Sequence, residues 1–207
     1  MASNLLIQFA REPVAGQVKT RMMPELSAQQ ACDLHRELVL WTCGSLLASG
    51  LGEVELAVAG DTGDRLFRQC RELGPIRVSR QRGADLGERM YLAIEQGLRE
   101  HPRVLLVGSD CPAIDASYLG LALDALDEVP LVLGPALDGG YVLIGAREIH
   151  PALFRGIDWG SERVFAQSLE RLREAGMSWL ALPALADIDR PADLKLWYGE
   201  RGRRGRA

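Results

Sequence analysis

The sequence feature that most constrains the fold is the uninterrupted aliphatic run Val104–Val107, which stops at the segment Gly-Ser-Asp-Cys-Pro. Such a run is typical of a strand buried on both faces, as in a parallel sheet. Other short apolar runs lie at residues 5–7, 54–59, 76–78, 131–133, 142–144 and 179–182. Helical patterns separate most of them, at residues 27–50, 86–98, 115–126 and 161–175, with a short one ending near 73 and a last one starting at Pro191. This alternation predicts an α/β fold: a single three-layer α/β/α domain around a mostly parallel sheet.

The length of 207 residues suits one domain, and no internal repeat or linker divides the chain. We expect residues 1–198 to form this domain. The remaining segment, 199–207, is rich in arginine and glycine, and we expect it to be a disordered basic tail.

Composition excludes several classes of partner. The net charge of -4 argues against nucleic-acid binding, which favours a basic surface. No apolar run approaches the roughly 20 residues that span a bilayer, so we expect no membrane partner. The N-terminus lacks the basic and apolar regions of a signal peptide, and the four cysteines form no C-x-x-C pair. We therefore expect a cytoplasmic protein without a disulfide framework or a zinc site, and leave open whether it forms a homo-oligomer.

The loop that follows the first expected strand carries Gly16, Lys19 and Arg21. Glycine lets the backbone approach a ligand closely, because it has no Cβ. Lysine offers a point charge and arginine a planar pair of donors to phosphate. The loop therefore fits a polyanion site, although a solvated basic loop is an equal alternative. In either case we expect both cations to be exposed without ligand, so that alanine at either position changes stability by only ~0.5 kcal/mol.

Acidic residues follow two other expected strands. Asp110 comes directly after Val104–Val107, and Asp187 and Asp189 follow the last strand. Ligands of such sheets bind beyond the carboxyl ends of the strands, where these side chains can meet. Mg²⁺ prefers hard oxygen ligands, often one or two carboxylates together with substrate phosphates. The alternatives are a turn-forming aspartate before a proline for Asp110, and helix capping for the other two.

The segment Asp138–Tyr141 combines an aspartate with paired glycines. Its glycines permit positive φ and close ligand approach, so Asp138 could bind a metal or a sugar hydroxyl. Asp-Gly is also a strong hairpin signal, and a tight turn between two strands is the alternative.

Four ordered motifs together resemble one bacterial family. They are Pro13-x-x-Gly16-x-x-Lys19-Thr20-Arg21, Gly108-Ser-Asp110-Cys-Pro112, Asp138-Gly-Gly-Tyr141 and Asp187-Ile-Asp189-x-Pro191-x-Asp193-Leu194. The family is the radical-SAM/selenodomain-associated transferase 1 family, also described as DUF2064. It is similar to the GT-A nucleotide-diphospho-sugar transferases, so the resemblance implies a GT-A fold.

The resemblance also implies roles for individual residues. Lys19, Arg21 and Asp110 would be catalytic, and Asp110 and Asp189 would hold the metal, Mg²⁺ or Mn²⁺. The residues expected to bind the nucleotide are Ala10, Gly16, Lys19, Arg21, Gln81, Gly83, Asp85 and Arg89. Those expected at the substrate or acceptor are Asp138, Gly139, Gly140, Tyr141 and Trp159. Two departures from the family pattern are Met22, in place of leucine, and Arg190, in place of a threonine that would cap the last helix.

The sequence therefore predicts a metal-dependent transferase that uses a nucleotide or nucleotide-sugar donor and a small-molecule acceptor. Glycosyl transfer and nucleotidyl transfer fit it equally well. The alternative is a non-catalytic nucleotide-binding or partner-interaction module on the same fold. A dehydrogenase is disfavoured, because the first loop lacks G-x-G-x-x-G.

Overall fold

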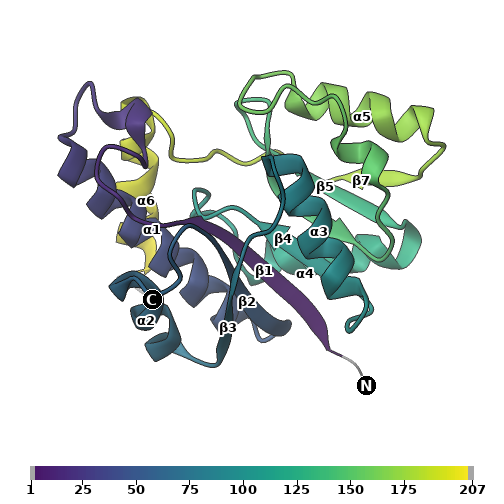
Figure 1. Cartoon of the computed structure of the whole chain (residues 1–207), viewed down its shortest axis with the longest axis horizontal. Coiled ribbons are helices and arrows are strands. Elements are labelled where there is room, and N and C mark those ends of the chain that lie inside the picture. The colour runs from purple at the N-terminus through teal and green to yellow at the C-terminus, as the bar shows by residue number, and fades with distance from the viewer. Residues whose placement is uncertain (1–2, 205–207) are drawn as a thin grey trace.

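The computed structural model of the chain describes residues 3–204, built around a seven-stranded sheet (Figure 1). The strand order is β3-β2-β1-β4-β6-β5-β7. The strands are β1 (Asn4–Arg11), β2 (Gly52–Ala59), β3 (Ile76–Arg80), β4 (Val104–Val107), β5 (Leu131–Pro135), β6 (Tyr141–Ala146) and β7 (Trp179–Ala181).

The sheet is mostly parallel, as predicted. β1 pairs in parallel with β2 and β4, β2 with β3, and β5 with β7. Among the described strands only β6 is reversed, and it pairs antiparallel with both β4 and β5. Within the segment Asp138–Tyr141, the first three residues thus lie in the turn of the β5–β6 hairpin and Tyr141 begins β6, so that the tight turn proposed as an alternative is present.

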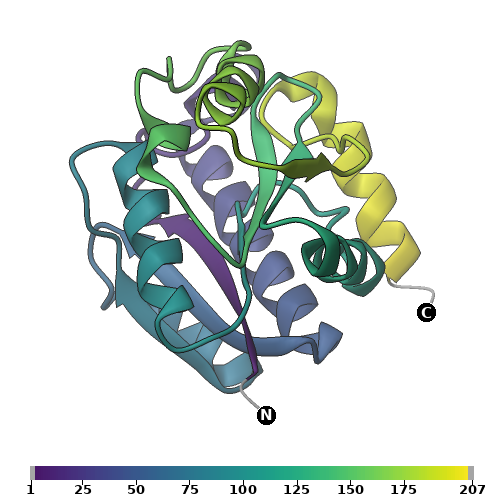
Figure 2. The same cartoon turned by 90° about the vertical axis from the view of Figure 1, so that its right-hand side faces the viewer.

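Helices cover both faces of the sheet. They are α1 (Ala28–Ser49), α2 (Arg65–Leu73), α3 (Leu86–Leu98), α4 (Ala116–Glu128), α5 (Val164–Glu174) and α6 (Leu194–Arg204), with short 3₁₀ turns η1 (Thr20–Met22), η2 (Pro151–Phe154) and η3 (Pro191–Asp193). Helices α1, α2 and α4 pack on one face, whereas α3, η2 and α5 pack on the other. Figure 2 shows α3 on the opposite side of the strands from α1 and α4. The three-layer prediction is confirmed.

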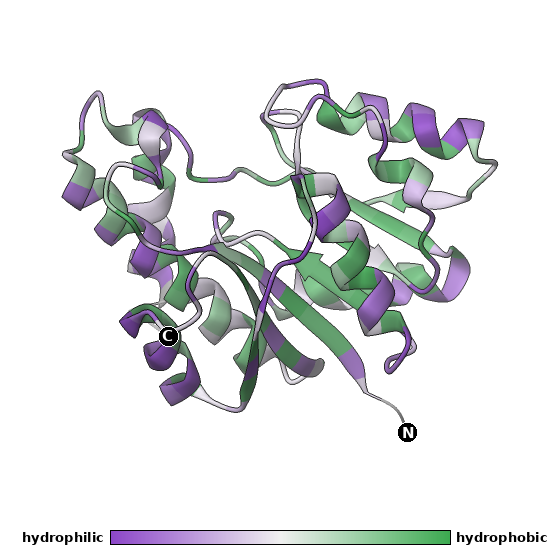
Figure 3. Ribbon diagram, viewed as in Figure 1, coloured by the Kyte–Doolittle hydropathy of each residue, from purple (hydrophilic) through white to green (hydrophobic). Residues whose placement is uncertain are grey.

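Local sequence explains the elements. Ser27 and Gln30 form a capping box at the start of α1, and Gly50 ends the helix in a left-handed conformation. In β1, Leu5 and Ile7 contribute to the core under α3, while Leu6 contributes to the core under α1 and α4. The apolar strands therefore lie between helices whose outer surfaces are hydrophilic (Figure 3).

The chain end differs from the expected tail. Residues 199–204 form the last part of α6 rather than a disordered segment, and residues 205–207 lie outside the described residues. α6 packs against α1, where Trp197 meets Trp41 edge-on and Arg201 pairs with Glu37. None of the helices within residues 3–204 combines the length and the hydropathy needed to cross a membrane.

Candidate functional site

The loops singled out in the sequence converge at one edge of the sheet. They follow the carboxyl ends of β1, β3, β4, β5 and β7, as a parallel sheet dictates. A cavity of about 680 Å³ opens there, which we call the edge cavity. The predicted residues that line it are Ala10, Lys19, Arg21, Gln81, Asp85, Arg89, Asp110 and Asp189. Gly16 and Gly83 are not among its lining residues.

The loop that carries Asp110 is fixed by several hydrogen bonds. The Ser109 hydroxyl donates to the Phe9 carbonyl (2.8 Å) and accepts from Gln8 Nε2 (2.9 Å). The backbone N–H of Ile188 donates to the Asp110 carbonyl (2.8 Å). Two segments distant in sequence, β1 and the loop at Ile188, thus hold the Asp110 backbone in place before any ligand arrives.

Lys19 is not the exposed loop cation that the sequence suggested. Its side chain is only 3% exposed, and its ammonium group donates to the Ile188 carbonyl. Nζ also lies 2.9 Å from Oδ1 of Asp110, whose side chain is 45% exposed. Because Oδ1 is itself buried, Oδ2 is the oxygen left to face the cavity. The expectation of exposure was wrong for Lys19, because its ammonium binds the Ile188 carbonyl in the loop after β7, a distant part of the chain.

The backbone of Lys19 is left-handed, with φ 51° and ψ 37°. It is the sole residue other than glycine with positive φ within the described part of the chain. A side chain in this region costs about 1–2 kcal/mol, so the fold maintains a strained residue here. Such strain is concentrated at functional sites in proteins.

Arg21 is exposed, as predicted for the cations of this loop. Its side chain is 48% exposed, and NH1 lies 2.7 Å from Oδ2 of Asp189. This hydrogen bond and charge, with weaker contributions from Asp138 and Asp187, raise the pKa of Arg21 above its usual value. Arg21 NH2 also donates to the Gly160 carbonyl (3.3 Å), which connects the first loop to the segment before α5.

Asp189 keeps its place although Arg190 replaces a capping threonine. Asp193 supplies the cap, since its Oδ2 accepts from the backbone N–H groups of Asp189 (3.1 Å) and Arg190 (2.7 Å). Asp187 lies beside them, and burial together with the negative charge of Asp138 raises the pKa of Asp187 to about 6.

The residues expected near the base or ribose have structural partners of their own. Gln81 Nε2 donates to the carbonyls of Ala10 (3.2 Å) and Ala57 (2.9 Å). Asp85 caps α3 by accepting from Glu88 N (2.8 Å), and Arg89 Nε donates to Gly83 O (3.1 Å). These contacts shape the wall of the edge cavity next to α3.

A second cavity, of about 220 Å³, lies beside the first, and we call it the aromatic cavity. Of the residues expected at the acceptor, Asp138, Gly140, Tyr141 and Trp159 line it, whereas Gly139 does not. Gly139 has another role, since a Cβ built on it would lie 2.0 Å from the Glu162 carbonyl. Arg21 lines both cavities, together with Phe9, Leu86 and Gly108, and is the charged residue at their junction.

The carboxylates present fit a metal ion that binds together with a phosphate-bearing ligand. Within residues 3–204, no group of three His, Cys, Asp or Glu side chains is close enough to hold an ion. Asp110 offers one outward carboxylate oxygen, and Asp189 is paired with Arg21. One or two carboxylates completed by phosphate oxygens is a common arrangement for Mg²⁺.

Two residues near the site were missed in the sequence. Gln8 is fully buried in β1, and its Nε2 also donates to the Val39 carbonyl (3.0 Å). The signal was a single polar residue within an apolar strand. His35 in α1 is the other; it lines the edge cavity and contacts the Arg11 carbonyl through Nε2 (3.0 Å).

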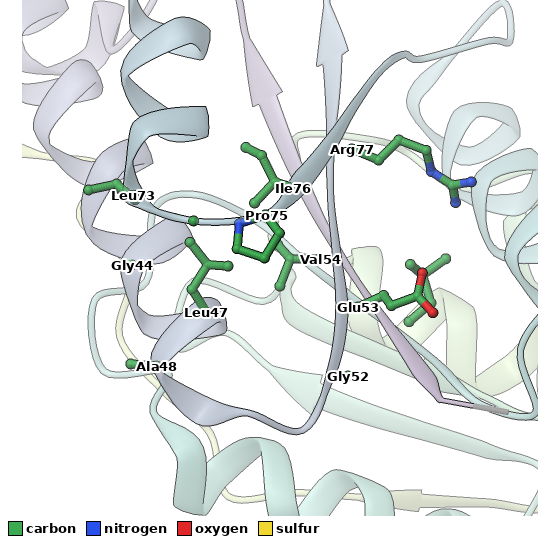
Figure 4. A pocket seen from close by; sticks show the side chains of 12 residues that line it. Gly44, Leu47, Ala48, Gly52, Glu53, Val54, Leu73, Pro75, Ile76 and Arg77 are labelled. Atoms are coloured by element: carbon green, nitrogen blue, oxygen red, sulfur yellow. The ribbon is translucent and has the colours of Figure 1, made fainter. Parts of the chain in front are cut away.

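A cavity larger than these two lies elsewhere, at the amino ends of β2 and β3 (Figure 4). It has about 860 Å³ and is walled by aliphatic side chains such as Leu47, Leu73 and Val54, with Glu53 and Arg77 at its margin. It contains none of the cation–carboxylate pairs described above. The chemistry of the edge and aromatic cavities, rather than volume, therefore identifies the candidate site.

A family model described as an uncharacterized protein conserved in bacteria, DUF2064, matches residues 42–161. The chain belongs to the DUF2064 family. This confirms the resemblance drawn from the motifs. No curated protein matches the sequence.

Solved structures extend the likeness of this DUF2064 chain to its whole length. A protein described as a nucleotide-diphospho-sugar transferase, from Desulfovibrio desulfuricans G20, is 33% identical with a TM-score of 0.85, over 96% of this chain and 87% of that one. The inositol-1-phosphate CTP transferase from T. maritima has a TM-score of 0.62 at 17% identity, over 97% and 96%. A CMP:2-keto-3-deoxy-manno-octonic acid synthetase in complex with CTP has a TM-score of 0.60 at 12% identity, over 98% and 99%. The last two proteins share the fold of this chain. At 17% and 12% identity, the likeness shows the fold alone.

Proposed function

We propose that the protein is a metal-dependent transferase that uses a nucleoside triphosphate or a nucleotide sugar as donor. The observation that carries this proposal is the presence of two cation–carboxylate pairs, Lys19–Asp110 and Arg21–Asp189, in one cavity at the carboxyl edge of the sheet. The 33% identical protein described as a nucleotide-diphospho-sugar transferase supports the same class of donor.

The two pairs suit a ligand that brings both signs of charge. Phosphate oxygens would replace the carboxylates as partners of Lys19 and Arg21, and a divalent metal would replace the cations at Asp110 and Asp189. A nucleotide alone would leave the two carboxylates without a positive partner. A metal alone would leave Lys19 and Arg21 without a negative partner. Donor and metal are therefore expected to bind together.

In the transfer itself, positioning and electrostatics supply most of the catalysis. Lys19 and Arg21 stabilise negative charge on the leaving phosphates, and Asp110 would hold the metal, which would supply further positive charge to those phosphates. In nucleotidyl transfer, an acceptor oxygen bonds to the α-phosphorus, pyrophosphate leaves, and the acceptor proton passes to water. In glycosyl transfer, the acceptor oxygen bonds to the sugar carbon, a nucleoside diphosphate leaves, and the proton again passes to water.

A thermal-shift matrix tests donor binding, with nucleoside triphosphates and nucleotide sugars each measured with and without Mg²⁺ or Mn²⁺. A ligand at 100 times its dissociation constant adds about 2.7 kcal/mol of stability. For a chain of this size that corresponds to an increase in Tm of roughly 5–10 °C. We expect the combined shift to exceed the sum of the separate shifts. A matrix without any nucleotide-dependent shift would contradict the proposal.

A non-catalytic nucleotide-binding module is distinguished by turnover. The matched assay incubates the best-binding donor with metal and follows release of pyrophosphate or nucleoside diphosphate, with Arg21→Ala as the control variant. Binding without product formation across a panel of alcohols would favour the module. Release that depends on Arg21 would favour the transferase.

A further inference from the structure

The aromatic cavity has walls that are mostly apolar. The ring of Tyr141 faces that of Trp159 at a centroid distance of 6.4 Å, and Phe9, Met90 and Val164 complete the lining with buried side chains. These residues come from β1, α3, β6 and the segment leading into α5. The cavity is therefore built from the sheet and both flanking segments rather than by one mobile loop.

The charges around this cavity are unfavourable for an anionic ligand. Among its described lining residues only Arg21 and Asp138 are charged. The guanidinium of Arg21 is already bonded to Asp189 and the Gly160 carbonyl, and Asp138 and Asp187 also act on it. A phosphate or carboxylate on an acceptor would add negative charge beside Asp138, Asp187 and Asp189, and Arg21 is the one cation among the described lining residues of this cavity.

The volume limits the size of the occupant. An apolar cavity of about 150 Å³ can hold benzene. The 220 Å³ of the aromatic cavity therefore admits one six-membered ring with a short substituent. The faces of Tyr141 and Trp159 favour a flat, weakly polar ring over an extended chain.

From these observations we infer that the acceptor is a small neutral alcohol with a single ring and without a phosphate or carboxylate group. This inference rests on the proposed function and adds the acceptor class to it. The ring occupies the aromatic cavity, and its hydroxyl group faces Arg21, where the two cavities meet. The acceptor then differs in charge from inositol 1-phosphate, the compound named for the T. maritima protein of the same fold.

The indole group of Trp159 provides a local probe. The chain contains four tryptophans, so its ¹⁵N-labelled form gives four indole N–H resonances, and Trp159→Phe identifies the one that belongs to this cavity. Trp41→Phe identifies a matched control, since Trp41 packs against Trp197 between α1 and α6. Benzyl alcohol and benzyl phosphate serve as test compounds, which share the ring and differ in that a charged phosphate ester replaces the hydroxyl group.

We expect benzyl alcohol to shift the Trp159 resonance saturably while the Trp41 resonance stays in place. Benzyl phosphate should need at least a tenfold higher concentration for the same shift. The inference is overturned if benzyl phosphate moves Trp159 at the same or a lower concentration. It is also overturned if benzyl alcohol leaves Trp159 unmoved.

Failure of this inference is separable from failure of the proposed function. If nucleotide with metal raises Tm but benzyl alcohol does not reach Trp159, the acceptor class is wrong and the donor proposal stands. If benzyl alcohol titrates Trp159 in a protein that no nucleotide stabilises, the cavity is confirmed as a neutral-ring site and its assignment as an acceptor site is wrong.

Discussion

Replacement of Lys19 tests the charge arrangement of the site directly, because its ammonium is buried whereas the guanidinium of Arg21 in the same loop is half exposed. Lys19→Met keeps the apolar stem and removes the charge. It leaves Oδ1 of Asp110 without a counter-charge and the Ile188 carbonyl without its donor. The free energy of unfolding should therefore fall.

The size of this loss in the free energy of unfolding follows from the burial of the Lys19–Asp110 pair. Removing one partner of a fully buried ion pair costs about 3–5 kcal/mol. Asp110 is 45% exposed, so water solvates part of its charge, and we take about half of that range. The unpaired Ile188 carbonyl adds about 1 kcal/mol. We expect Lys19→Met to cost about 2–4 kcal/mol, and Lys19→Ala to cost about 2 kcal/mol more through three lost buried methylene groups.

Urea unfolding followed by circular dichroism measures these changes. Arg21→Ala is the matched control from the same loop, and its half-exposed pair with Asp189 should contribute no more than ~1 kcal/mol. The double variant Lys19→Met/Asp110→Asn should recover at least about 1 kcal/mol relative to the sum of the single changes. If Lys19→Met is no more destabilising than Arg21→Ala, Lys19 is a solvated loop residue and the reasoning is wrong.

Three further outcomes are expected. Asp110→Asn should abolish the extra Tm shift that metal adds to nucleotide, because a neutral amide is a poor ligand for a hard cation; an unchanged shift would remove Asp110 from the metal site. Burial outweighs the hydrogen bond to Arg11 and lowers the pKa of His35, so stability from this residue is complete above about pH 6.5 and declines as pH falls below it. His35→Gln should reduce that decline in urea titrations at pH 5 and pH 8, and an identical decline would contradict the assignment. Gly87→Ala should displace Trp159 and weaken the benzyl alcohol shift at least tenfold by NMR, whereas Gly44→Ala, at a glycine with open space, should leave it unchanged.

The sequence predicted the order of elements and the edge of the sheet at which the site lies. Both follow from local patterns, because apolar runs such as Val104–Val107 specify buried strands and parallel strands bring their following loops together. The burial of Lys19 was not predictable in this way, since its partner carbonyl at Ile188 lies 169 residues further along the chain. The helical end of α6 was missed for the same reason: its arginine-rich sequence is stabilised by Trp197 and Arg201 against α1.

The contact between Gly87 and Trp159 has a consequence for how this family can vary. A Cβ built on Gly87 would lie 2.6 Å from a ring carbon of Trp159, so a large ring at position 159 requires glycine at position 87. The two positions should therefore change together among relatives. Members with a small residue at 159 are free to carry a side chain at 87, and their aromatic cavities should be correspondingly wider. The pair of residues thus serves as a sequence marker from which the size of this cavity can be compared across the family.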